Sequence, residues 1–135
     1  MITVETTVNG PIEKIWDFWT TPKHIQKWNN PTDEWHTPFV ENDVKAGGKF
    51  KYTMAKKDKS VSFNYEGIYT KIDKFLVIEY QLVDNRTVSV EFESQEDDMV
   101  KITEIFEPEK AHPASEQKQF CQGVIDNFKK YTEAN

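Results

Sequence analysis

The feature that most constrains the fold is the amphipathic pattern of residues 113–131. About nineteen residues at ~1.5 Å each form a helix roughly 28 Å long. Pro113 is suited to the first helical position, where its missing N–H needs no partner. Apolar side chains recur at the three-and-four spacing of one helical face: Phe120, Cys121, Val124, Ile125, Phe128 and Tyr131. Such a helix needs a partner that covers its apolar face, and most of the preceding chain has the pattern of β-strands.

Apolar and polar side chains alternate through much of residues 2–106, as they do in strands with one buried face. We expect strands at residues 2–8, 34–40, 49–54, 62–72, 75–82, 87–92 and 100–106, and short helices at 11–20 and 23–28. Short turns between the strands predict antiparallel pairing. Pro38 places its strand at an edge, and Gly67 indicates a bulge or sharp bend that lets the sheet curl. The sequence therefore predicts an α+β fold in one domain, residues 1–135, in which a curved antiparallel sheet of about six or seven strands wraps around a long C-terminal helix, with two short helices after the first strand.

The composition argues against several classes of function. The formal net charge is −6, whereas a general nucleic-acid-binding surface is basic. No apolar run reaches the ~18 residues of a membrane span, and the amino end has no signal-peptide pattern, so we expect a cytoplasmic protein without membrane insertion. One cysteine and three widely spaced histidines match no metal-ligand pattern, and no phosphate or dinucleotide glycine motif is present, so we expect neither a metal nor a cofactor. The acidic residues Glu93, Glu96, Asp97 and Asp98 are interpreted as a solvated hairpin tip, with an acidic docking site as the alternative.

Three side chains are candidates for acid–base chemistry. His36 titrates near neutral pH, although a structural histidine bonded to a turn is the alternative. Glu66 and Glu104 each lie within an alternating strand, and Glu104 shares a face with apolar residues. A glutamate on an inward face has a raised pKa unless a donor, such as Arg86 or a tyrosine hydroxyl, pairs with it. An inward glutamate is a general acid, a polar anchor for the head group of a ligand, or one member of a structural buried pair. The alternative is that both glutamates lie on the solvated convex face, because a one-residue shift of register exchanges the faces.

Several stretches in combination resemble one superfamily. They are IEKIW (12–16), WTTPKHI (19–25) with Trp28, WHTP (35–38), AGGKF (46–50), FNYEGIY (63–69) and IDNFKKY (125–131). In this order they resemble the START-like (SRPBCC) helix-grip superfamily. Within it they are most similar to the group named for the C-terminal domain of the activator of the ninety-kilodalton heat-shock chaperone's ATPase.

The resemblance implies a hydrophobic chamber between the sheet and the last helix. Members of the superfamily bind lipids, sterols or polyketides, act as cyclases, or dock on chaperones, so the fold alone does not choose a function. Small bacterial members of the group often carry Gly-Trp in the middle of the last helix, where this chain carries Phe120-Cys121. If that helix forms a wall of the chamber, Phe120 narrows it and Cys121 opens space beside it.

Three hypotheses about function remain. The first is non-catalytic binding of a small hydrophobic or aromatic ligand in the chamber. The expected ligand-binding residues are Trp19, Trp35, Phe50, Tyr52, Phe63, Tyr65, Tyr80, Phe92, Phe120, Val124 and Phe128. The second is a protein-interaction module, such as a chaperone co-factor or stress-response protein. The third is a cyclase- or hydrolase-like enzyme that uses His36 with an inward glutamate, Glu66 or Glu104. An empty chamber of several hundred cubic ångströms favours the first, and a packed interior with an apolar surface patch favours the second.

Overall fold

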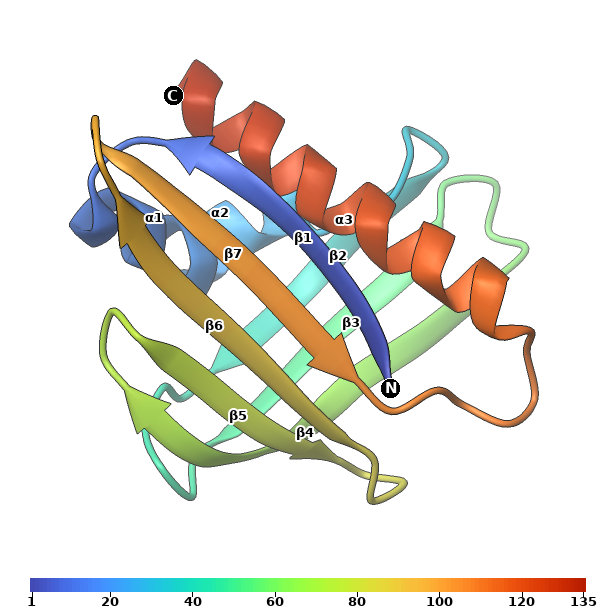
Figure 1. The fold of residues 1–135 in the computed structure, drawn as a ribbon. Helices are drawn as coiled ribbons and strands as arrows, with labels where there is room; N and C mark the ends of the chain where they lie inside the picture. Colours follow the sequence, from blue (N-terminus) through green and yellow to red (C-terminus); the bar gives the residue numbers. More distant parts are fainter.

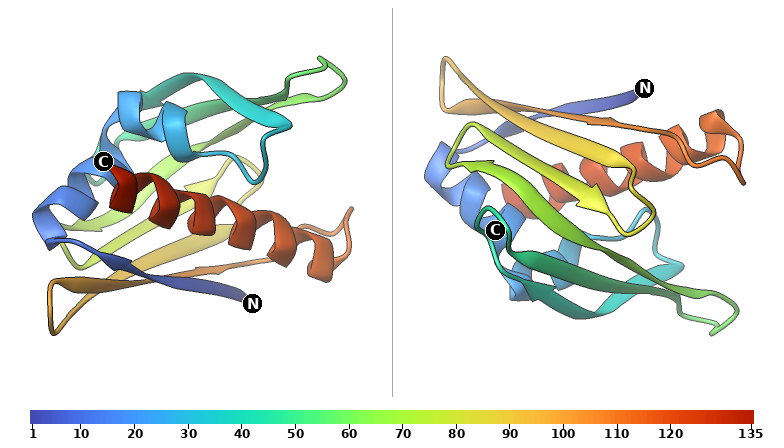
Figure 2. Two further views of the ribbon diagram at one scale, coloured as in Figure 1. Left: turned by 90° about the horizontal axis from the view of Figure 1, so that it is seen from above. Right: turned by 90° about the horizontal axis from the view of Figure 1, so that it is seen from below.

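The computed structural model describes all of residues 1–135. One antiparallel sheet holds seven strands in the order β1-β7-β6-β5-β4-β3-β2. The strands are β1 (Ile2–Asn9), β2 (Trp35–Asn42), β3 (Lys49–Lys56), β4 (Ser62–Asp73), β5 (Val77–Leu82), β6 (Thr87–Gln95) and β7 (Met99–Phe106). The helices are α1 (Ile12–Thr20), α2 (Pro22–Trp28) and α3 (Ala114–Ala134). The sheet curls around α3, which lies along its concave side (Figures 1 and 2). The expected α+β architecture is confirmed.

The concave face of the sheet is apolar because every second residue of each strand points toward it. The pairing of β6 with β7 sets Phe92 opposite Ile102 and Val90 opposite Glu104. The pairing of β1 with β7 adds Val4 on the other side of Glu104. The four apolar residues are buried in the core. The core therefore lies between the sheet and α3, and one carboxylate is set among its apolar side chains.

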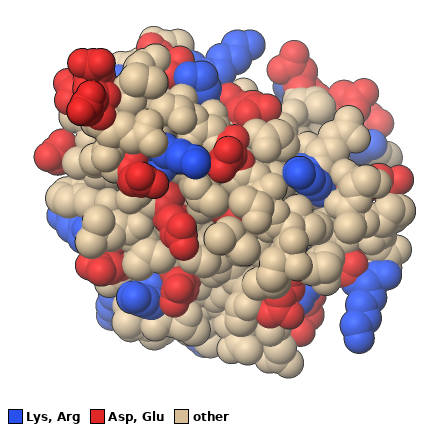
Figure 3. Space-filling view, in the orientation of Figure 1, with Lys and Arg blue, Asp and Glu red and all other residues tan.

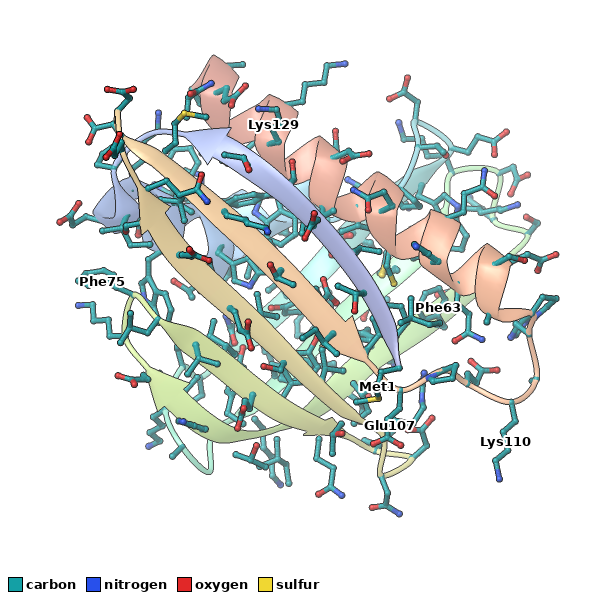
Figure 4. All side chains as sticks on the ribbon, viewed as in Figure 1. Met1, Phe63, Phe75, Glu107, Lys110 and Lys129 are labelled. Atoms are coloured by element: carbon teal, nitrogen blue, oxygen red, sulfur yellow. The ribbon has the colours of Figure 1, made fainter.

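The last helix, α3, is hydrogen-bonded to α2 on one side and to β1 on the other. Its most buried side chains are Ile125, Phe128 and Thr132. The Asn127 side-chain N–H donates to the carbonyl oxygen of Trp28 over 2.8 Å. Lys129, which is labelled on α3 in Figure 4, donates from Nζ to a carbonyl oxygen of β1 over 2.7 Å. The helix continues three residues beyond the predicted end at Tyr131, to Ala134. These bonds hold α3 against α2 on one side and against β1 on the other.

The two short helices close one end of the half-barrel (Figure 2). Ile15 of α1 and Ile25 of α2 are fully buried there. Trp16 packs against Phe75 and Phe92, with ring centroids 5.9 and 5.2 Å apart. The early aromatic residues of the chain therefore join the helices to the sheet.

Two local expectations are wrong. The strand predicted to begin at residue 75 begins at Val77, because Phe75 adopts a left-handed backbone (φ 73°) in a turn that leaves Leu76 57% exposed. A bulge or a sharp bend was expected at Gly67, and the irregular pairing lies further along β4, between Tyr69 and Lys71. Gly67 instead allows close approach of two strands, since a Cβ there would lie 2.4 Å from the Gln81 carbonyl oxygen. Glycine is therefore required at position 67 because there is no room for a Cβ atom between the two strands, and not because the strand bulges there.

Charged side chains of both signs cover the outer surface (Figure 3). Acidic groups gather over the turn between β6 and β7, where Glu96, Asp97 and Asp98 are exposed, as expected for a solvated hairpin tip. No helix is long and apolar enough to cross a membrane. No group of three or more histidine, cysteine, aspartate or glutamate side chains is placed to hold a metal ion.

Candidate functional site

A cavity of about 100 Å³ lies between the concave face of the sheet and α3. Fifteen residues line it, and thirteen of them are hydrophobic. The lining residues are Trp19, Trp28, Asn29, Phe50, Tyr52, Met54, Phe63, Tyr65, Tyr69, Ile78, Tyr80, Glu104, Phe120, Cys121 and Val124. Both helical and strand residues contribute, so the cavity exists only when the two layers are assembled.

Five aromatic rings from adjacent strands form the sheet wall of the cavity. Phe50 and Tyr52 come from β3, Tyr65 and Tyr69 from β4, and Tyr80 from β5. The register sets Tyr52 opposite Tyr65 and Tyr69 opposite Tyr80. The Phe50 ring centroid lies 4.8 Å from that of Tyr80 and 5.1 Å from that of Tyr69. Alternation on three paired strands is what gathers these rings on one face.

The tyrosine hydroxyls on this wall bind one another or a neighbouring amide. The Tyr65 and Tyr80 hydroxyl oxygens are 2.6 Å apart, and the Tyr69 hydroxyl donates to the side-chain oxygen of Asn42. Burial raises the pKa of Tyr69 to about 12, and burial also raises the pKa values of Tyr52, Tyr65 and Tyr80 well above their usual value. All four hydroxyls therefore stay protonated near neutral pH.

Two tryptophans form the helical wall. The rings of Trp19 and Trp28 are stacked with centroids 4.8 Å apart. Phe128 of α3 packs edge-on against both, with centroids 4.8 and 4.9 Å away. The Trp28 indole N–H donates to the carbonyl oxygen of Phe18 over 2.8 Å. This side of the cavity is thus closely packed, and the Trp28 indole N–H is paired.

Three rings close the end of the cavity near the start of α3. Trp35, Phe63 and Phe120 lie with centroids 5.5 to 6.4 Å apart. Phe63 is 38% exposed and points toward the first half of α3 (Figure 4). Phe120 lines the cavity on one side and, on the other, an open polar groove between residues 31–35 and α3. The Phe120 side chain therefore separates the cavity from the outside at this point.

Glu104 is the one ionisable carboxyl group in the cavity. No side chain donates a hydrogen bond to it or forms an ion pair with it. Arg86, one of the possible donors, instead binds Asp84 in the turn before β6, with Nε 2.7 Å from the carboxylate oxygen. Burial raises the pKa of Glu104 to about 7. Burial also raises the pKa of Cys121, so this thiol is not a nucleophile near neutral pH.

Most of the residues expected to bind a ligand line the cavity, and their role in binding stays a prediction. Trp35, Phe92 and Phe128 do not line it. Phe92 packs beneath Trp16 and Trp19, Phe128 beneath Trp19 and Trp28, and Trp35 against the outer side of Phe120. All three side chains point toward the protein interior or the edge of the cavity, but other side chains separate them from the cavity.

Sequence reasoning missed several lining residues. They are Trp28, Asn29, Met54, Tyr69, Ile78 and Cys121. Strand alternation could have found Met54 and Tyr69, since they share faces with Phe50 and Tyr65. Nothing in the sequence pattern pointed to Asn29, which follows α2 and whose side-chain N–H lies 3.4 Å from the Thr37 hydroxyl.

The three acid–base candidates are not brought together. His36 is exposed on the edge strand β2, where the irregular pairing between His36 and Phe39 turns Thr37 inward instead. Glu66 lies on the convex face of β4, as the alternation about it requires. Only Glu104 reaches the cavity. The histidine–glutamate pair that the enzyme hypothesis needs is therefore absent from this site.

A curled antiparallel sheet that holds a long C-terminal helix, with a chamber between them, defines the START-like helix-grip class. Residues 9–133 match the family model described as activator of Hsp90 ATPase homolog 1-like protein. The chain belongs to this family.

Solved structures agree with this assignment. The chain is 32% identical to an AHSA1-like protein from Aeromonas hydrophila, with 98% of this chain and 93% of the other covered and a TM-score of 0.85. It is 44% identical to a protein from Cytophaga hutchinsonii, with 99% and 92% covered and a TM-score of 0.84. A protein from Chromobacterium violaceum shares the fold at 16% identity, with 99% and 98% covered and a TM-score of 0.84. A comparison with curated proteins gave no significant match.

Proposed function

We propose that this protein binds a small apolar or aromatic molecule in the cavity between the sheet and α3, without catalysing a reaction. The observation that supports this most directly is the cavity itself, in which hydrophobic residues make up thirteen of fifteen lining positions. Ligand sites in proteins are typically concave and aromatic-lined, with a few polar groups that orient the ligand. Glu104 and the tyrosine hydroxyls are such polar groups.

The cavity is smaller than the several hundred cubic ångströms expected from the sequence for a ligand chamber, and its size limits the ligand. Its volume is about 100 Å³, whereas sites for drug-sized molecules span roughly 300–1,000 Å³. An apolar cavity of about 150 Å³ is known to hold benzene. The ligand is therefore a compact molecule with a branched alkyl group or one small ring. Sterols and lipids would require the walls to move.

The expected result for the proposal is saturable binding of compact neutral probes such as tert-butanol, toluene and phenol. Desolvation supplies the affinity, at ~25 cal/mol for each Å² of apolar surface buried. Val124→Phe fills the cavity and should abolish binding, because Val124 lines the space directly. Two-dimensional NMR titration of the wild type and the variant measures this, with the indole N–H signals of Trp19 and Trp28 as reporters.

The matched control is Val83→Phe, the same change at a side chain that is 71% exposed. It should bind the probes as the wild type does. Cys121→Leu gives a second, smaller filling variant whose folding is easier to preserve. Equal binding by the wild type and both filling variants, or no binding by the wild type, would contradict the proposal.

A second candidate function is interaction with a chaperone, which the description of the matching family favours. Exposed large apolar side chains that could serve such a contact come from separate places, among them Phe39 on β2, Leu76 before β5 and Val83 after it. Single exposed apolar residues are common on protein surfaces, so they do not define an interface. Titration of the protein into a purified Hsp90-type chaperone, followed by calorimetry and ATPase rate, tests this candidate. We expect binding that Val124→Phe leaves unchanged, since an interaction surface does not need the cavity.

A further inference from the structure

We infer that the ligand is a compact ammonium compound, a protonated amine or quaternary ammonium with small apolar substituents, held between the Glu104 carboxylate and the tyrosine wall. This inference rests on the proposed function, since it names the chemical class that the same cavity accepts. Three features of the cavity support it: an unpartnered carboxyl group, rings that attract cations, and an acidic exterior.

The first feature is that Glu104 is a carboxyl group in the cavity wall that has neither a hydrogen-bond donor nor an ion-pair partner. Tyr65 and Tyr80 bind each other, and Tyr69 binds Asn42. The nearest arginine is held by an aspartate outside the cavity. A buried carboxylate without a partner is strongly unfavourable, and donors or a positive charge relieve this. A neutral apolar ligand would leave Glu104 as it is, and an anionic ligand would bring a like charge next to it. A cation with N–H donors or a diffuse positive charge is complementary to it.

The second feature is the aromatic wall that shares the cavity with Glu104. The face of an aromatic ring attracts cations within about 6 Å of its centre, and the attraction is stronger when water is excluded. The Tyr80 ring lies with its centroid 6.1 Å from those of Tyr65 and Tyr69, at interplanar angles of 90° and 89°. Rings at right angles surround a small volume from more than one side. An aromatic enclosure with one carboxylate is the combination that suits an ammonium group.

The third feature is the charge outside the cavity. The groove beyond Phe120 is lined by Glu34, Glu116 and Asp126 and by a single lysine, Lys118. The whole chain carries a formal charge of −6. A field of this sign raises the local concentration of cations and repels anions. The exterior therefore favours the same class of ligand as the interior.

The protonation of Glu104 gives the inference a further consequence. Its pKa of about 7, raised by burial, means that the carboxyl ionises just above neutral pH when the cavity holds no cation. The other titratable groups that face the same space are Tyr52, Tyr65, Tyr69, Tyr80 and Cys121, and burial keeps all of them protonated in this range. The residues opposite Glu104 on β1 and β6 are valines. Binding of a cation should therefore strengthen as the pH rises through about 7, and Glu104 alone should account for the change.

The test compares two probes of the same shape, tert-butylammonium and tert-butanol, at about pH 8, where Glu104 is ionised and the amine is protonated. NMR titration gives the dissociation constant of each. We expect the ammonium to bind the wild type about tenfold more tightly than the alcohol. In Glu104→Gln this preference should fall to about one. Glu66→Gln, the same change on the convex face of β4, should keep the preference.

Each other outcome has a distinct meaning. Equal binding of both probes to the wild type overturns the inference and leaves the proposed function in place. An undiminished preference in Glu104→Gln also overturns it, because the carboxylate is then not the recognising group. Absence of binding for both probes contradicts the proposed function itself, and the inference with it. Glu104→Gln removes an ionisable group that is unfavourable when buried, so the variant is expected to fold.

Discussion

Replacing Phe128 with alanine is expected to lower the free energy of unfolding by about 3–5 kcal/mol. The Phe128 side chain is fully buried at the point where α1, α2 and α3 meet. Its ring packs edge-on against Trp19 and Trp28, the two tryptophans that form the helical wall of the cavity. Alanine would remove the buried surface and leave a second empty space that rigid neighbours cannot fill. Urea denaturation followed by tryptophan fluorescence measures the loss.

Two further variants make this result interpretable. Phe39→Ala removes the same side chain at a position that is 43% exposed on β2, and it should cost less than about 1 kcal/mol. Phe128→Leu keeps an apolar group of similar volume and should cost less than about 1.5 kcal/mol. Similar losses for Phe128→Ala and Phe39→Ala would show that α3 is not packed on the tryptophans as described.

The sequence predicted the layers of this fold well because the layers depend on short-range periodicity. Alternation over residues 100–106 placed Glu104 on the same face as Ile102, and the structure has both on the concave side. The spacing of Ile125 and Phe128 placed these residues on one face of a helix, and both are buried. In each case the neighbours along the chain decide which residues share a face, whereas the inward direction of the face that carries Glu104 was left open by the sequence and follows from the register.

The lining of the cavity was less predictable, because it depends on which inward side chains block others. Trp28 and Trp35 both carry large rings in the same part of the chain, yet Trp28 stacks on Trp19 at the cavity wall and Trp35 packs outside Phe120. The difference follows from the packing of α2 beside α1 and from the irregular start of β2. Neither feature produces a periodic pattern of apolar residues in the sequence.

The volume of the cavity could not be predicted at all. It is the small difference between the space that the sheet and α3 enclose and the volume of the rings that fill it. The residue types indicated a chamber, but a cavity of about 100 Å³ depends on ring positions within an ångström or so. Membership of the family fixes the fold and leaves this quantity open, which is why the class of ligand has to be argued from Glu104 and its surroundings.

The free energy of unfolding is expected to fall by about 3 kcal/mol as the pH rises from about 4.5 to about 7, through Glu104 alone. Below about 4.5 the carboxyl is protonated in both the folded and the unfolded chain, and its contribution is constant. Between the two values the unfolded chain has lost the proton while the folded chain still binds it, so unfolding becomes easier with each step in pH. Above about 7 both states are ionised and no further loss follows.

The measurement is a series of urea denaturations from about pH 4 to pH 8 on the wild type and Glu104→Gln. Glutamine cannot ionise, so the variant should match the wild type near pH 4 and be more stable by about 3 kcal/mol near pH 8. Asp84 and Glu133 have lowered pKa values, through their bonds to Arg86 and Lys129, and they change stability in the opposite direction. Because the wild type and Glu104→Gln both contain Asp84 and Glu133, the contributions of these two groups cancel in the difference between the two free energies of unfolding. If the stability difference between Glu104→Gln and the wild type does not vary with pH, Glu104 is solvated or paired in solution. An unpartnered carboxyl group in an apolar cavity requires instead that this difference rise between about pH 4.5 and pH 7. The corresponding difference for Glu66→Gln should show no such rise.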